Sequence, residues 1–144
     1  MNRRRAREYA LQMLFQFDFT ENKSFAEIPA ISLEEDGQGK FSGEAEAVKT
    51  YAEELFRGTV TNREEIDRAI QSAAEHWEMG RMMAVDRNIL RLSAYELLYR
   101  KDIPPAVAID EALEIAKKYS SQESASFING LLDRIAKSVR EKTQ

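Results

Sequence analysis

Apolar side chains recur at regular intervals at the start of the chain. The members of this stripe are Ala6, Ala10, Leu14 and Phe17. Their spacings of four, four and three residues place them on one face of an α-helix. The pattern predicts a helix over residues 3–19. Phe15 lies off the stripe, so we expect its ring to be partly exposed.

Similar stripes predict helices along most of the remaining chain. The expected helices cover residues 22–31, 43–58, 61–77, 85–102, 105–119 and 120 onward. Residues 33–43 are polar and acidic and contain three glycines, which predicts a loop. No stretch alternates between apolar and polar residues for long enough to predict a strand. The chain is therefore expected to be all-α, with about seven helices.

Several features predict where individual helices begin. Thr61 and Glu64 have the spacing of a capping box, and so do Ser120 and Glu123. In such a box two side chains satisfy two backbone amides at the start of a helix. Pro105 suits the first position of a helix, where its missing N–H costs nothing.

Two residues within the predicted helices need an explanation in terms of packing. Gly130 lies in a clear helical stripe, where glycine costs about 1 kcal/mol relative to alanine. We expect it there because two helices approach closely at that point. Trp77, at the end of a predicted helix, is expected in the core, and His76 beside it at the surface.

Composition narrows the class of protein. The chain has 144 residues, which suits about one domain. It contains no cysteine, which excludes disulfides and cysteine-ligated metals and agrees with a reducing cytoplasm. Because His76 is the only histidine, we expect no metal site, and no other cofactor is indicated. No apolar run approaches the roughly 18 residues needed to span a bilayer, so no membrane partner is expected.

Positive charge is concentrated at the N-terminus of a chain whose net charge is -4. The cations are Arg3, Arg4, Arg5 and Arg7. A helix N-terminus is already positive, so each cation there is disfavoured by roughly 0.3–1 kcal/mol at low salt. Repeating this unfavourable placement predicts a bound anion that compensates for it, unless the arginines form only a solvated, charged terminus.

Several short motifs occur together in the second half of the chain and at its start. They are R-R-x-A-R-E (3–8), L-R-x-x-x-Y-E-L (90–97), D-x-P (102–104), V-A-I-x-E-A (107–112), A-K-x-aromatic (116–119) and F-x-N-G-x-L-D (127–133). In this combination they resemble the NusB family of bacterial transcription antitermination factors. The match touches both ends of the chain, whereas residues 20–60 add only a helical pattern.

This resemblance implies a fold and a function. The fold would consist of two small helix bundles, residues 1–60 and 61–144, packed together as one compact domain. The function would be to bind boxA, a short single-stranded RNA element of ribosomal RNA leaders. A small-subunit ribosomal protein acting as NusE would bind with it, and the pair would join the RNA polymerase antitermination complex and promote read-through of terminators.

The resemblance also implies which residues make these contacts. RNA-binding positions are Arg3, Arg4, Arg5, Arg7, Lys117, Lys118, Glu123 and Phe127, and positions that meet the ribosomal protein are Phe15, Asp86 and Glu123. Arginine suits phosphate because its planar fork donates two hydrogen bonds and stays charged. Glu123 also fits a helix cap and Phe127 a core stripe, so a structural role stays open for both.

Other functions have to be separated from this one. The chain could be a protein-binding helical adaptor whose arginines have no role, or the NusB-like domain of an RNA methyltransferase. The absence of cysteine argues against the methyltransferase, because that chemistry uses a cysteine nucleophile. With no evident nucleophile and base pair, we expect the protein not to be an enzyme. Whether it forms a homodimer when free of its partner is left open.

Overall fold

The computed structural model describes residues 2–18 and 43–142 of the chain. Within these ranges it contains α-helices, one short 3₁₀ helix and no strand, which confirms the expected all-α class. The expected helix over residues 22–31 lies outside the described residues, and so does most of the expected loop over residues 33–43. Only Gly43 of that loop is described, and it begins a helix.

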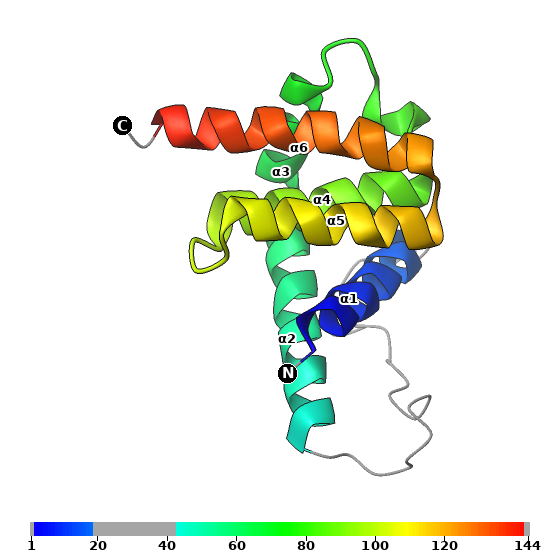
Figure 1. Cartoon of the computed structure of the whole chain (residues 1–144), viewed down its shortest axis with the longest axis vertical. Coiled ribbons are helices and arrows are strands. Elements are labelled where there is room, and N and C mark those ends of the chain that lie inside the picture. Colours follow the sequence, from blue (N-terminus) through cyan, green and yellow to red (C-terminus); the bar gives the residue numbers. More distant parts are fainter. Residues whose placement is uncertain (1, 19–42, 143–144) are drawn as a thin grey trace. The chain divides into compact units, whose positions relative to one another are not determined.

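Six α-helices and the 3₁₀ helix follow one another along the described chain (Figure 1). They are α1 (Arg3–Asp18), α2 (Gly43–Thr61), α3 (Arg63–Ala73), η3 (Met79–Arg81), α4 (Ala84–Tyr99), α5 (Pro105–Tyr119) and α6 (Gln122–Lys142). The chain divides into two compact units, residues 1–58 and residues 59–144. The last turn of α2 crosses the boundary between them.

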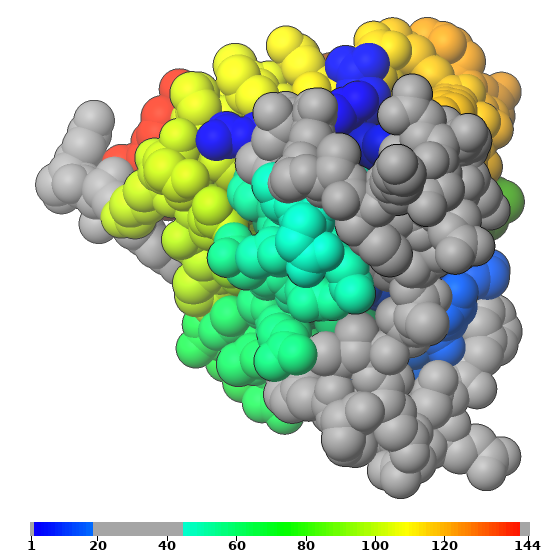
Figure 2. Space-filling model, turned by 90° about the horizontal axis from the view of Figure 1, so that it is seen from below, coloured from blue at the N-terminus to red at the C-terminus, as the bar shows by residue number. Residues whose placement is uncertain are grey.

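The first unit contains α1 and most of α2. All members of the α1 stripe predicted from the sequence are buried, with exposed fractions of 5% or less. Tyr51, Leu55 and Phe56 of α2 are buried as well. Phe17 of α1 meets Phe56 edge to face, with the ring centroids 5.6 Å apart, so the C-terminal end of α1 packs on α2. The outer side of α2, cyan in Figure 2, forms part of the molecular surface.

In the second unit α4 is the central helix. It packs against α3, α5 and α6, and Figure 1 shows α4, α5 and α6 side by side. Deeply buried residues of this layer include Ile89, Leu90 and Ala94 of α4 and Ile128 and Leu132 of α6, all at most 2% exposed. The apolar layer fixes the start of α6, where several of the predicted site residues lie.

A bidentate ion pair ties α4 to α3. Nε of Arg91 donates to Oδ1 of Asp67 at 2.9 Å, and its Nη2 donates to Oδ2 at 3.1 Å. The Arg91 side chain is only 8% exposed, against 30% for Asp67. Removing the carboxylate would therefore leave a buried charge without this partner, which is a strongly destabilising change.

The starts of α3 and α6 differ from those predicted. Thr61 lies in the last turn of α2, and the N-cap of α3 is Asn62, whose side chain makes no capping bond, so this capping box is wrong. At α6 the backbone N–H of Ser124 donates to Oγ of Ser121 at 3.0 Å. The cap is therefore one residue later than predicted, because Ser120 ends α5 as its C-cap. Pro105 begins α5, as expected.

The packing explanations for Gly130 and Trp77 are also wrong. A Cβ atom built on Gly130 would meet no other atom within 4 Å, so no close helix contact requires glycine there. Trp77 is 59% exposed. It follows the end of α3 at Ala73, so the helical stripe that assigned it to the core does not continue to its position.

Among the described residues, no helix combines the length and apolarity that a bilayer crossing needs. In the same part of the chain, no group of three or more acidic or histidine side chains is placed to hold a metal ion.

Candidate nucleic-acid and partner interface

The arginines predicted to bind an anion occupy the first turns of α1. The backbone N–H of Arg5 donates to Oδ1 of Asn2 at 3.1 Å, so Asn2 caps the helix. The first turn of α1 holds no acidic residue. Positive side chains and the positive end of the helix dipole therefore act together at this end of α1, which favours an anion.

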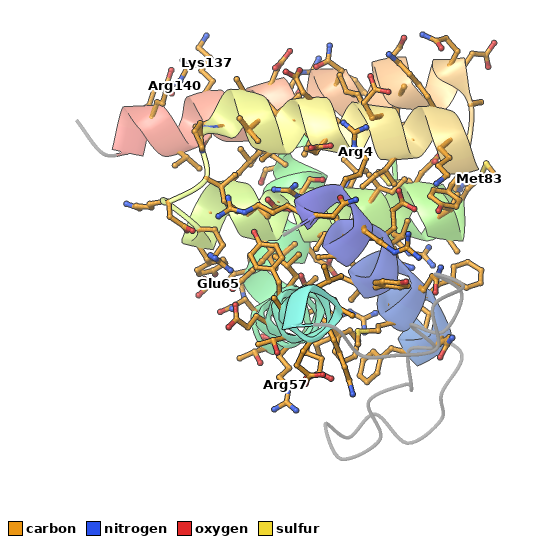
Figure 3. All side chains as sticks on the ribbon, turned by 60° about the horizontal axis from the view of Figure 1, so that its bottom comes forward. Arg4, Arg57, Glu65, Met83, Lys137 and Arg140 are labelled. Carbon is orange, nitrogen blue, oxygen red and sulfur yellow. The ribbon has the colours of Figure 1, made fainter. Side chains whose placement is uncertain are left out.

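Aromatic rings hold two of these guanidinium groups at the surface. Cζ of Arg3 lies 5.7 Å from the ring centroid of Tyr51, and Cζ of Arg5 lies 5.5 Å from that of Tyr9. Nε of Arg5 also donates to Oη of Tyr9 at 3.0 Å. Arg3 and Arg4 are exposed and Arg5 is half-buried. The N-terminal residues, dark blue in Figure 2, reach the molecular surface, and Figure 3 labels Arg4 among them.

Arg7 differs from the other three arginines. It is only 2% exposed, whereas its charge alone had suggested a surface position. A buried guanidinium cannot reach a phosphate unless the surrounding side chains move. The predicted phosphate contact of Arg7 therefore does not fit its burial, whereas Arg3, Arg4 and Arg5 are exposed or half-buried.

Phe15, a predicted contact for the ribosomal protein, also lies on α1. Its ring is 41% exposed, as its position off the apolar stripe had predicted. A single exposed aromatic residue is common on protein surfaces, so exposure alone does not assign it a partner.

In the second unit, the predicted site residues gather around the junction of α5 and α6. Lys117 and Lys118 lie in the last turn of α5 and are exposed. Nζ of Lys117 lies 3.7 Å from Oε1 of Glu114, and Nζ of Lys118 lies 5.1 Å from the ring centroid of Tyr119. Both cations are favoured by the negative end of the helix dipole, so their position has a structural reason as well.

A chain of hydrogen bonds leads from this junction to Asp86. Oγ of Ser120 donates to Oγ of Ser124 at 2.9 Å, and Oγ of Ser124 donates to Oδ2 of Asp86 at 2.8 Å. Asp86 is 6% exposed, and its Oδ1 accepts no hydrogen bond from any described residue. A buried acceptor without a donor is costly, and because this oxygen is buried, a donor from a partner would reach it only if the surrounding side chains moved.

Glu123 and Phe127 occupy the first turns of α6. Glu123 is exposed in the first turn. Phe127 is half-buried and meets the ring of Trp77 edge to face, with centroids 5.7 Å apart and an interplanar angle of 70°. The aromatic surface at the start of α6 is therefore formed jointly with the segment that follows α3.

Sequence reasoning missed several residues of this region. Ser124, Trp77 and Arg134 each make a contact with a residue far away in the sequence. Nη1 of Arg134 donates to the backbone oxygen of Ala73 at 2.7 Å, across 61 residues, and so satisfies a carbonyl at the end of α3. No local pattern signals such a contact. Trp77 stands out in the sequence as the only tryptophan, but its contact with Phe127 does not follow from that.

These features define a small all-α protein that combines a basic helix end with a buried acceptor at a helix junction. Comparison with protein-family models matches residues 4–137 to the NusB family, and the chain belongs to this family. The transcription antitermination protein NusB of Thermodesulfovibrio yellowstonii is 46% identical over 140 residues, which cover 95% of this chain and 93% of the relative. The name of this relative describes a protein that regulates transcription.

Solved structures agree with the family assignment. NusB of T. maritima superimposes with a TM-score of 0.80 at 41% identity, covering 99% of this chain and 97% of that one. A crystal structure of the antitermination factors NusB and NusE in complex with double-stranded RNA matches with a TM-score of 0.74 at 30% identity. That match covers 94% of this chain and 96% of the solved one.

Proposed function

We propose that this protein is a transcription antitermination factor that binds RNA together with the ribosomal protein NusE. Relatives that match nearly the full chain are named transcription antitermination proteins. A solved relative forms a complex with NusE and RNA. The RNA is the boxA element of ribosomal RNA leaders, and the complex promotes read-through by RNA polymerase. The protein acts by binding, without catalysis, in the cytoplasm.

The exposed arginines of α1 are the observation that carries the RNA-binding part of this proposal. Arg3 and Arg4 are exposed at a helix end that holds no acidic residue in its first turn. Guanidinium groups bind phosphate through paired, charge-assisted hydrogen bonds. The ring contacts of Arg3 and Arg5 reduce the side-chain freedom that binding would otherwise remove. Lys117, Lys118, Glu123 and Phe127 are proposed as further RNA contacts.

Asp86, Glu123 and Phe15 are the proposed contacts for NusE. A backbone or side-chain N–H of NusE would donate to Oδ1 of Asp86, the oxygen that no described residue satisfies, once the side chains that bury this oxygen move on binding. Ser124 holds the other carboxylate oxygen and so orients the group. Phe15 would add apolar contact area from its 41% exposed ring.

The test is fluorescence anisotropy of a labelled boxA RNA with NusE present. The variant carries Arg3→Ala, Arg4→Ala and Arg5→Ala. The control removes the same number of charges through Arg57→Ala, Lys137→Ala and Arg140→Ala, whose exposed side chains point away from their helices (Figure 3). We expect the first variant to lose about tenfold or more in affinity, because its phosphate contacts are gone, and the control to lose little.

Equal losses in both variants would place the RNA away from the start of α1. If the wild-type protein with NusE binds neither single-stranded nor double-stranded boxA RNA, the RNA-binding function is wrong. A helical adaptor that binds only proteins would then be the better description.

A further inference from the structure

A cavity of about 300 Å³ lies between α6 and the segment that connects α3 to α4. We call it the Trp77 pocket, and the residues that matter for its chemistry are Glu75, Trp77, Phe127, Gly130 and Arg134. In Figure 1 the green segment between α3 and α4 passes beside α6. All of these residues belong to the second unit.

Two aromatic rings form one side of the Trp77 pocket. Trp77 is 59% exposed and is held by its edge-to-face contact with Phe127. A large ring kept at the surface in a fixed orientation offers a platform for another flat ring. Stacking on such platforms is the usual way in which proteins bind unpaired bases, and it tolerates any base because each has a π-face.

Gly130 is an exposed residue in the lining of the Trp77 pocket. It lies within α6, where alanine would be about 1 kcal/mol more stable. A Cβ atom at this position would meet nothing within 4 Å, so neither a turn nor a tight contact requires glycine. What glycine does provide is open space at this position of the pocket lining.

The edge of the pocket carries groups that can recognise the polar side of a base. The carboxylate of Glu75 is an acceptor for exocyclic amino groups, the same chemistry by which acidic side chains recognise cytosine. The bond from Arg134 to the backbone of Ala73 holds its guanidinium, with its positive charge, beside the cavity. A cation there suits the phosphate that accompanies every base.

We infer that the Trp77 pocket binds one unpaired base of the RNA, stacked on the Trp77 ring that Phe127 holds in place, with the amino group of the base bonded to Glu75. This inference rests on the proposed RNA-binding function and deepens it. Phe127 lies one turn along α6 from Glu123, so the pocket continues the surface already proposed for RNA. An occupant with a flat ring, amino donors and an adjacent negative charge is a nucleotide.

The chain provides its own probe, because Trp77 is its only tryptophan. The experiment follows anisotropy of labelled single-stranded boxA RNA and emission of Trp77 in the same titration, with NusE present at constant concentration. A series of RNAs, each lacking one base but keeping the backbone, locates the stacked nucleotide. We expect RNA to quench Trp77, and one abasic RNA to bind without quenching and about tenfold more weakly.

Two variants separate pocket occupancy from folding. Gly130→Leu adds a bulky side chain to the pocket lining at a position where the Cβ atom meets no other atom, so it should obstruct the cavity, reduce quenching and lower RNA affinity about tenfold. Trp77→Ala should lower affinity to a similar extent. Gly130→Ala is the stability reference, and its thermal midpoint should rise by a few degrees because it favours helix.

The outcomes are distinguishable from those of the proposed function. If RNA binds but Trp77 emission and the affinities of all variants stay unchanged, the pocket is not a base site, while the proposed function stands. If NusE alone changes the emission and RNA adds nothing, the pocket belongs to the protein partner and the inference is overturned. If no RNA binds at all, both proposals are wrong.

Discussion

Individual side chains with the same charge have different tasks at the start of α1. Arg4 is exposed, whereas Arg7, one turn further along the helix, is 2% exposed. Aromatic rings orient the guanidinium groups of Arg3 and Arg5. Charge could be assigned from the sequence, but the division into surface and buried arginines depends on packing.

We predict that Arg4→Ala mainly weakens RNA binding, whereas Arg7→Ala mainly lowers the stability of the fold. Arg4→Ala should change the free energy of unfolding by no more than about 0.5 kcal/mol, as for most surface substitutions, and should weaken RNA binding. Arg7→Ala removes a buried side chain and should destabilise the protein by about 1–3 kcal/mol. Urea denaturation and RNA anisotropy on both variants check this, and a larger binding loss for Arg7→Ala at full folding would contradict it.

Ser121 and Ser124, at the start of α6, lead to a second prediction about single residues. Ser124→Ala removes the donor to Oδ2 of Asp86 and should cost about 1–3 kcal/mol of stability, because Oδ1 already lacks a donor among the described residues and Oδ2 then loses the bond from Ser124. It should also weaken NusE binding. Ser121→Ala removes only the helix cap and should cost about 1 kcal/mol with NusE affinity unchanged.

Calorimetric titration with NusE compares the two serine variants. Equal NusE affinity for both would show that the orientation of Asp86 does not matter to the partner.

Among the helices, α3 and α4 are joined by two polar contacts. Besides the ion pair of Arg91 and Asp67, Oη of Tyr99 on α4 donates to Oε2 of Glu65 on α3. The hydrogen bond to Glu65, with burial and the glutamate charge adding to it, raises the pKa of Tyr99 to about 12. Both contacts join the first two turns of α3 to α4.

The raised pKa predicts a pH dependence. Because the folded state favours the neutral phenol, the contact contributes its full stability below about pH 10, the ordinary tyrosine pKa, and loses it as pH rises toward 12. Glu65→Ala should return the pKa of Tyr99 to about 10. Absorbance titration near 295 nm, with Tyr99→Phe to assign the signal, measures it, and an unchanged titration in Glu65→Ala would refute the contact.

The ion pair should matter more for stability than the tyrosine contact. Asp67→Ala leaves the buried Arg91 without its bidentate partner and should cost about 3 kcal/mol or more in urea denaturation. Arg63→Ala is a suitable control, because Arg63 meets the same carboxylate only at 3.9 Å with a 34% exposed side chain. We expect it to cost less than about 1 kcal/mol.

Helix positions followed from the spacing of apolar residues, but helix ends did not. The α1 stripe is buried as predicted, because it depends only on spacing within one helix. The cap of α6 is Ser121 and not the predicted Ser120, because Ser120 is the C-cap of α5. The position of this cap therefore depends on two helices together. Trp77 was misplaced for a similar reason, since α3 ends before it.

For the whole molecule, the sequence motifs predicted the family and the basic end, and tertiary contacts define the rest of the site. The bond from Ser124 to Asp86 spans 38 residues and that from Arg134 to Ala73 spans 61. Neither contact, nor the cavity that Gly130 lines, has a local signature. Residues of this kind become visible only once the helices are packed.

The central claim is that exposed arginines at the start of α1 bind RNA phosphates in a complex with NusE. The most direct measurement is the affinity for single-stranded boxA RNA as a function of salt concentration, with NusE saturating. Three phosphate contacts predict a slope of log affinity against log salt that is about 2 units shallower in the Arg3, Arg4 and Arg5 triple alanine variant than in the wild type. Equal slopes in the two proteins would contradict the claim.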